Sequence, residues 1–84
     1  MVNLSFNEKL ILLQYAINKY EVENVLVEKL RNILPQNEIE RTIDTLIGTQ
    51  KVRRIGPDVL QNNISHTGEL PDLPEHLKTV VDNL

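Results

Sequence analysis

The sequence predicts a small, mostly helical α+β domain in which three helices precede a β-hairpin and a short helix follows it. Apolar residues recur at helical spacing in three consecutive stretches of the N-terminal half. After Gly48 this spacing gives way to short runs on either side of a Gly56-Pro57-Asp58 turn. With 84 residues the chain is one domain with one modest core.

Composition excludes several classes of protein. The chain has no cysteine, so it is neither a disulfide miniprotein nor a cysteine-ligated zinc module. With 40% hydrophobic residues and a net charge of −3, it is too apolar and too evenly charged to be disordered. Its longest unbroken apolar run is Leu10–Leu13, and its N-terminus does not have the pattern of a signal peptide. We therefore expect an intracellular, cytoplasmic protein that does not enter a membrane.

The first helix is predicted over Phe6–Lys19. The sequence Ser5-Phe6-Asn7-Glu8 has the spacing of a capping box, in which the serine and glutamate side chains each bond the other residue's backbone amide. Apolar residues then follow at helical spacing and predict the buried face of the helix; they are Phe6, Leu10, Leu13, Ile17 and Tyr20.

Two further helices are predicted on either side of Pro35. The second spans Val25–Ile33, with Asn24 as its N-cap, and it ends because the residue before a proline is pushed out of helical geometry. The third spans Asn37–Ile47, and Gly48 is expected to close it in a left-handed conformation. Because the gap between these helices is short, they are expected to cross each other.

The rest of the chain predicts a hairpin and a last helix. Extended runs at Lys51–Ile55 and Val59–Ile64 form the hairpin, which Ser65-His66-Thr67-Gly68 closes. Pro74 suits the start of an amphipathic helix over Glu75–Asp82. At about two turns this helix cannot stand alone in water, so it is expected to pack on the domain or on a partner.

These elements divide the chain into a domain over residues 1–69 and, over residues 70–84, a linker with the C-terminal helix. The apolar stripes of the first three helices are the only surfaces available to cover one another. The predicted core is Leu10, Leu13, Ile17, Leu30, Ile39, Ile43 and Leu46. The apolar stripe of the C-terminal helix, a possible dimer interface, is Leu77, Val80, Val81 and Leu84.

Three segments resemble parts of the winged helix-turn-helix superfamily. Leu26, Leu30 and Leu34, followed by Pro35-Gln36-Asn37-Glu38-Ile39-Glu40-Arg41, resemble its second helix, turn and third helix. Leu46-Ile47-Gly48 followed by Lys51-Val52-Arg53-Arg54 resembles the passage from the recognition helix into the first wing strand. Ile64-Ser65-His66-Thr67-Gly68-Glu69 is similar to the segment that leaves the wing in bacterial and archaeal regulators. The resemblance covers about residues 5–69 and does not identify a subfamily.

The resemblance implies a small DNA-binding protein that acts as a transcriptional regulator. We expect it to be a dimer, because a monomer of this size offers few contacts. In DNA-binding members the third helix enters the major groove and the wing touches phosphates or the minor groove. The candidate base-reading residues are Gln36, Asn37, Arg41 and Thr45, and the candidate phosphate-contacting residues of the wing are Lys51, Arg53 and Arg54. An ordinary solvated surface is the alternative for both groups.

The charge of the third helix favours a different partner. This helix carries Glu38, Glu40 and Asp44 against Arg41 alone, and Arg41 lies three residues from both Glu38 and Asp44, a spacing that favours pairing within the helix. Acidic residues at a DNA surface oppose binding to phosphates. The alternative function is therefore a winged-helix protein–protein interaction module that uses an acidic third helix and does not bind DNA.

No motif predicts an enzyme. The two histidines, His66 and His76, have no cysteine and no partner at a ligand spacing, so no metal site is expected. Ser65, His66 and Asp72 lack a nucleophile elbow, and the glycines form no phosphate-binding run. We expect no catalytic residue, no metal and no cofactor.

Overall fold

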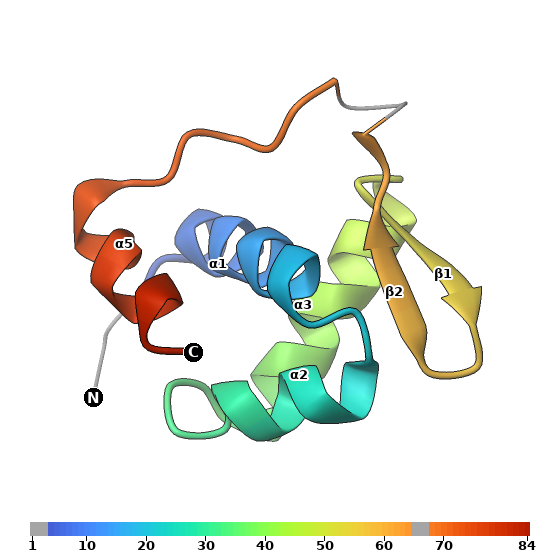
Figure 1. Ribbon diagram of the computed structural model, residues 1–84, viewed down its shortest axis with the longest axis horizontal. Helices are drawn as coiled ribbons and strands as arrows, with labels where there is room; N and C mark the ends of the chain where they lie inside the picture. Colours follow the sequence, from blue (N-terminus) through green and yellow to red (C-terminus); the bar gives the residue numbers. More distant parts are fainter. Residues whose placement is uncertain (1–3, 65–67) are drawn as a thin grey trace.

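The computed structural model describes residues 4–64 and 68–84 and has the predicted order of elements (Figure 1). Its helices are α1 (Phe6–Lys19), α2 (Glu23–Leu30), α3 (Gln36–Gly48) and α5 (Glu75–Asp82), and its strands are β1 (Val52–Gly56) and β2 (Val59–Asn62). The two strands pair as an antiparallel hairpin. This α+β arrangement matches the winged-helix layout that the sequence predicts. Within the described residues no helix has the length and apolar character that a membrane span requires.

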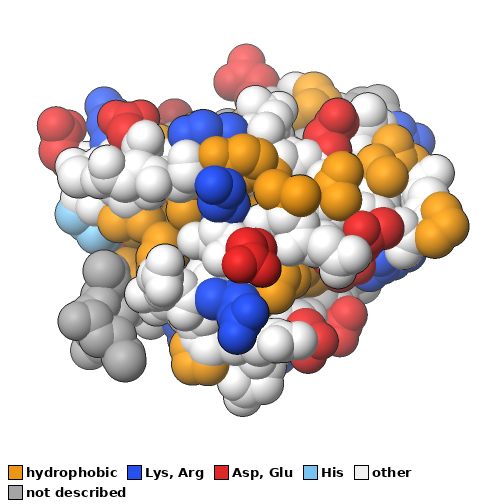
Figure 2. Space-filling view, turned by 60° about the horizontal axis from the view of Figure 1, so that its bottom comes forward, with side chains coloured by type: hydrophobic (Ala, Val, Ile, Leu, Met, Phe, Trp, Pro, Cys, Tyr) orange, Lys and Arg blue, Asp and Glu red, His pale blue; other side chains and the backbone are white. Residues whose placement is uncertain are grey.

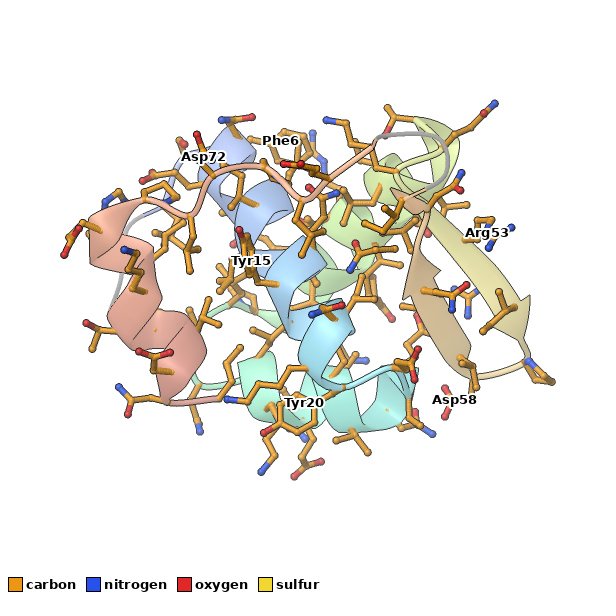
Figure 3. The ribbon with its side chains drawn as sticks, turned by 45° about the horizontal axis from the view of Figure 1, so that its top comes forward. Phe6, Tyr15, Tyr20, Arg53, Asp58 and Asp72 are labelled. Carbon is orange, nitrogen blue, oxygen red and sulfur yellow. The ribbon has the colours of Figure 1, made fainter. Side chains whose placement is uncertain are left out.

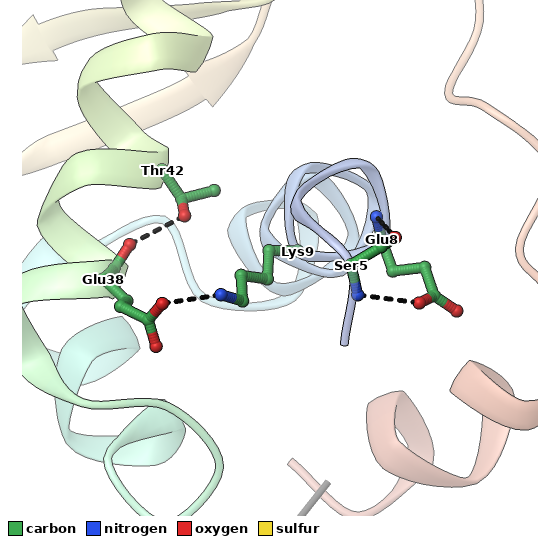
Figure 4. Close-up of polar contacts among 5 residues, drawn as sticks. All are labelled: Ser5, Glu8, Lys9, Glu38 and Thr42. Atoms are coloured by element: carbon green, nitrogen blue, oxygen red, sulfur yellow. Dashed lines mark hydrogen bonds and ion pairs between the residues drawn. The ribbon is translucent and has the colours of Figure 1, made fainter. Parts of the chain in front are cut away.

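Helix α1 begins where the capping box predicts. The Glu8 amide donates to Ser5 Oγ at 3.2 Å and the Ser5 amide donates to Glu8 Oε1 at 2.9 Å (Figure 4). The helix runs through the middle of the molecule, between α5 on one side and the hairpin on the other (Figure 1). Phe6, predicted on the buried stripe, is instead 44% exposed. It lies in the first turn, where its ring is covered by Arg41 of α3 rather than by the core.

The segment between α1 and α2 pairs with β2 on the side away from β1. Val22 pairs with Val59 in an isolated antiparallel bridge. Beside it, the Leu60 amide donates to the Glu21 carbonyl at 2.8 Å. Strand β2 therefore lies between β1 and Val22, and the hairpin is fastened to the helical part of the domain.

This pairing of the α1–α2 segment with the hairpin explains why the predicted start of α2 is wrong. Helix α2 begins at Glu23, with Val22 as its N-cap, and Asn24 lies inside the helix. The Glu23 amide donates to the Asp58 carbonyl at 2.8 Å. A backbone group of the hairpin thus binds the amide of the first helical residue, and a capping side chain at Asn24 is not used.

The predicted end of α3 also differs from the structure. Gly48 is still helical, and the left-handed residue is Gln50, with φ of 63°. The Thr49 amide and hydroxyl both donate to the Thr45 carbonyl at 2.9 Å, so the helix ends one residue later than predicted. The Gln50 carbonyl then accepts from the Asn63 side chain at 3.0 Å, which holds the turn into β1.

One hydrophobic core joins all the elements. Of the predicted core residues, six are buried and Leu10 is only partly buried against them. Within the described residues the buried apolar side chains are Leu4, Leu12, Leu13, Ala16, Ile17, Leu26, Leu30, Leu34, Ile39, Ile43, Leu46, Val52, Leu60 and Leu77. Strand residues belong to this set because the inner face of the hairpin packs on α1 and α3.

Helix α5 has the predicted bounds and packs on α1 of its own chain. Residues 68–74 cross over α1 from the hairpin to reach it (Figure 1). Two tyrosines of the α1 segment donate to backbone carbonyls of the C-terminal segment. Tyr15 Oη donates to Pro71 at 2.6 Å and Tyr20 Oη donates to Leu84 at 2.7 Å. These bonds fix the linker and the end of α5 against the domain.

Glu8 makes the stability of the fold vary with pH in the acidic range. The Ser5 amide and the His76 ring, which contacts the carboxylate from α5, lower the pKa of Glu8 below its ordinary value. A carboxyl group whose pKa is lower in the folded chain stabilises the fold above its unfolded pKa. That contribution is lost as the pH falls through the folded pKa.

We therefore expect Glu8→Gln to lower the melting temperature at about pH 6 and to have little effect at about pH 3. Thermal melts of both proteins across this range measure the difference. Glu28→Gln is the matched control, because Glu28 is exposed and has no side-chain bond within the described residues. An equal effect of Glu8→Gln at both pH values would contradict the prediction.

Candidate nucleic-acid interface

The outer face of α3 carries most of the predicted base-reading side chains. Gln36, Asn37 and Arg41 are exposed, as are the acidic Glu40 and Asp44. Because this face looks away from the buried residues of the helix, every one of these five side chains is open to a partner.

The fourth predicted residue of α3, Thr45, is less available. It is half-buried, and its hydroxyl donates to the Arg41 carbonyl at 2.9 Å within the helix. Such a bond satisfies the hydroxyl locally. Thr45 therefore offers a partner its methyl group and the acceptor side of its hydroxyl, but not the hydroxyl proton.

Arg41 is not paired within its own helix. Glu38 instead accepts from Lys9 of α1, with 2.6 Å between Lys9 Nζ and Glu38 Oε1 (Figure 4). The Arg41 guanidinium lies over the Phe6 ring, 5.8 Å from its centre. Within the described residues Arg41 forms no ion pair. Its charge therefore stays unneutralised on the outer face of α3.

The two wing arginines have different partners. Arg53 is exposed and its Nη2 donates to the neutral Gln61 Oε1 at 3.1 Å. Arg54 is held by both oxygens of Glu23 in α2, with Nη1–Oε1 of 2.8 Å and Nη2–Oε2 of 3.3 Å. This carboxylate raises the pKa of Arg54 further above its already high value. Lys51, the third predicted wing residue, is half-buried just before β1.

Charge on the molecule is mixed. Figure 2, which brings the α2 side forward, shows acidic and basic side chains interspersed, with no continuous basic patch on that face. A groove of about 380 Å³ between α2 and α3 has Glu28, Arg31 and Glu40 in its lining. The face next to α3 is therefore not uniformly attractive to phosphates.

Exposed apolar side chains lie near the same elements. Val22 and Val25 are one helical turn apart at the start of α2, and both are exposed. Ile55 is 53% exposed and sits at the irregularity in register between Arg54 and Gly56 of β1. Sequence periodicity does not identify these positions, because their exposure depends on how the hairpin meets α2.

The candidate dimer residues are already partly covered within the chain. Leu77, on the inner face of α5, is fully buried, whereas Val80, Val81 and Leu84 are half-buried. A hollow of about 300 Å³ beside α5 has Val80, Leu84 and Ile33 in its lining. Only the last three residues of the predicted stripe keep surface that a second copy can cover.

No cluster in the described chain has the composition of a metal site: no three His, Asp or Glu side chains come together there. His76 contacts Glu8. The predicted hairpin closure, which includes Ser65, His66 and Thr67, lies outside the described residues.

One contact of the candidate interface has no signal in the sequence. Glu23 and Arg54 are 31 residues apart and meet only because the hairpin folds back against the start of α2.

Comparison with protein-family models, with curated proteins and with solved structures finds no significant match to this chain.

Proposed function

We propose that this protein is a small DNA-binding transcriptional regulator of the cytoplasm, with α3 as its reading helix and the hairpin as its wing. The observation that carries the proposal is the free outer face of α3, which exposes Gln36, Asn37 and Arg41 beside a wing that exposes Arg53 and Arg54. Helix α3 packs directly against β1, so the wing adjoins this helix. Arg54 lies on the side of β1 nearer to Glu23 and Asp44, whereas Arg53, the preceding residue of the strand, points to the other side, toward Gln61 and the end of α1.

The residue types of this surface match the chemistry of a duplex. Asparagine and glutamine suit the edge of adenine, arginine suits guanine, and a carboxylate accepts from the amino group of cytosine. Gln36, Asn37 and Arg41 therefore supply contacts to purines, and Glu40 supplies one to cytosine. Arg53 and Arg54 supply the phosphate contacts that position the helix.

The Glu23–Arg54 ion pair is compatible with this role. Both side chains are partly exposed, and an exposed ion pair contributes about 0–1 kcal/mol. A DNA phosphate is a comparable partner for the guanidinium, so Arg54 exchanges Glu23 for phosphate at small cost. Glu23→Gln should therefore strengthen DNA binding, and it should do so less when Arg54 is alanine.

Titration of random duplex DNA at several salt concentrations tests the proposal. Arg53→Ala and Arg54→Ala should each weaken binding to all sequences and reduce the slope of log affinity against log salt by about 1. Lys78→Ala is the matched control, because Lys78 is an exposed cation of α5, away from the wing. Absence of binding to any duplex at low salt, where attraction is strongest, would overturn the proposal.

Charge reversal on α3 tests which face meets the duplex. Glu40→Lys and Asp44→Lys should strengthen non-specific binding, since each removes an exposed acid from the proposed surface and adds a cation. Glu75→Lys on α5 is the control and should leave binding nearly unchanged. Equal effects of all three variants would show that α3 does not face DNA.

The second candidate function is a protein-interaction module without DNA binding. It is favoured by the exposed Glu40 and Asp44 of α3 together with the exposed Val22, Val25 and Ile55 nearby. Such a surface suits a basic partner with apolar side chains. Failure of every duplex to bind at low salt selects this function over the first.

The proposed regulator acts as a homodimer. The half-buried Val80, Val81 and Leu84 offer a surface on α5 that a twofold mate can cover. Two copies would double the number of DNA contacts that one small domain makes. The surface proposed for DNA is a binding surface, and no catalytic group, metal or cofactor takes part in the proposal.

A further inference from the structure

A hollow of about 350 Å³ lies where the C-terminal end of α1 faces the wing. Its lining includes Ile17, Asn18, Glu21, Arg53, Gln61 and Asn62. Figure 3 shows Arg53 on the wing strand. The volume is at the lower end of the range for small-molecule sites, which suits a ligand of few atoms.

Two opposite charges in this lining do not neutralise each other. Within the described chain the Glu21 carboxylate forms no ion pair, and Arg53 donates only to the neutral amide oxygen of Gln61. An unpaired anion and an unpaired cation on one hollow are complementary to a ligand that carries both charges.

The lining also contains a buried acceptor without a donor. Asn62 is 8% exposed, and its Nδ2 donates to the Gln14 carbonyl at 2.8 Å, which fixes the orientation of the amide. Its Oδ1 meets no donor among the described residues. A buried acceptor left unpaired costs free energy, and an N–H group of a ligand is the partner it lacks.

We propose that this hollow binds a free α-amino acid. The ligand carboxylate pairs with Arg53, and its ammonium group lies between the Glu21 carboxylate and Asn62 Oδ1. The ligand carboxylate replaces Gln61 Oε1 as the partner of Arg53. Asn62 Oδ1 is closed off from solvent in the unbound structure, so the binding of the ammonium group requires neighbouring side chains of the hollow to move aside. The aliphatic floor at Ile17 accommodates a small side chain.

Arg53 links this site to the surface proposed for DNA, and this step alone rests on the proposed function. An amino acid that occupies Arg53 withdraws one of the two wing arginines from phosphate. The amino acid and DNA should therefore weaken each other's binding by the same factor. The amino acid would act as an effector that releases the protein from DNA.

The site itself is tested without DNA. Each of the small neutral L-amino acids is added in turn, at about 10 mM, to the isotopically labelled full chain, and the backbone amide NMR shifts are followed. A site with a Kd of about 1 mM is then mostly filled. Saturable shifts are expected at the residues that line the hollow. The N-acetyl and methyl ester derivatives of the same amino acid, which lack one charge each, should produce none.

Two variants separate binding from folding. Glu21→Gln should reduce the affinity at least tenfold, because it removes the partner of the ammonium group, while the Glu21 carbonyl keeps its bond to β2. Asn62→Leu should abolish binding, because it removes the acceptor of the ammonium group; its melting temperature is measured alongside, since the substitution also removes the bond from Asn62 Nδ2 to the Gln14 carbonyl. Glu28→Gln, an exposed acid outside this hollow, is the matched control and should bind as the unaltered chain does.

Three results would overturn the proposal. They are the absence of shifts with every amino acid, equal shifts with the singly charged derivatives, and unchanged binding by Glu21→Gln. Because the assay contains no DNA, these results are independent of whether the protein binds a duplex. If it does bind a duplex, the amino acid should lower the DNA affinity of the unaltered chain more than that of Glu21→Gln.

Discussion

Replacement of Ile43 by alanine is expected to lower the free energy of unfolding by about 2–5 kcal/mol. Ile43 is 1% exposed and lies in the middle of α3, on the face that packs against α1. Truncation removes buried apolar surface and leaves a cavity that a small core cannot refill. Since small domains are stable by only about 5–15 kcal/mol, the variant should be close to unfolding.

Urea denaturation of the two proteins measures this loss. Asp44→Ala, which alters the exposed next residue of the same helix, should change the free energy of unfolding by about 0.5 kcal/mol or less. A loss below about 1 kcal/mol for Ile43→Ala would show that α3 does not pack on the core as described.

Removal of residues 74–84 is expected to cost at least as much stability as a core truncation. Leu77 of the deleted helix is 0% exposed, and the deletion strips this side chain from α1 together with the bond from Tyr20 to Leu84. The single substitution Leu77→Ala should account for about 2–5 kcal/mol of the loss. Thermal melts should show both variants destabilised, the deletion more strongly.

Sedimentation of the same variants separates packing from assembly. If α5 also joins two copies, the deletion should reduce the sedimenting mass to that of one chain, and Val80→Asp should do so with less loss of stability. Val80 is chosen because it is half-buried on the partly exposed side of α5. A deletion variant that melts and sediments like the full chain would contradict any packing role for α5.

Local pattern was sufficient to predict most of the secondary structure. The bounds of α1 and α5 follow from apolar spacing and from end signals at Ser5 and Pro74, and both were predicted correctly. The misplaced starts and ends have different causes. The start of α2 is shifted by a long-range contact, in which the Glu23 amide bonds the Asp58 carbonyl of the hairpin. A single sequence does not display contacts of that kind. The end of α3 is shifted by Thr49, which bonds the Thr45 carbonyl and keeps Gly48 helical. Helix α2 also ends at Leu30, three residues before the predicted Ile33.

The candidate DNA surface was predictable in composition but not in electrostatics. Helical spacing correctly placed Asn37 and Arg41 on the outer face of α3. It wrongly favoured pairing of Arg41 within the helix, because Glu38 is taken by Lys9, 29 residues away. Long-range ion pairs of this type depend on how helices cross, which apolar periodicity leaves open.

The position of β1 at the outside of the small sheet has a consequence for solubility. Strand β2 has β1 on one side and, at Val59 and Leu60, the Glu21–Val22 segment on the other. Within the described residues, β1 has no strand paired on its outer side and presents an open row of backbone groups. Such an edge is a template for pairing with another chain and for aggregation. The edge is short, carries Arg53 and Arg54, and is interrupted by an irregularity in register at Ile55. These features keep a second β1 strand from adding to it, whatever partner the wing arginines bind.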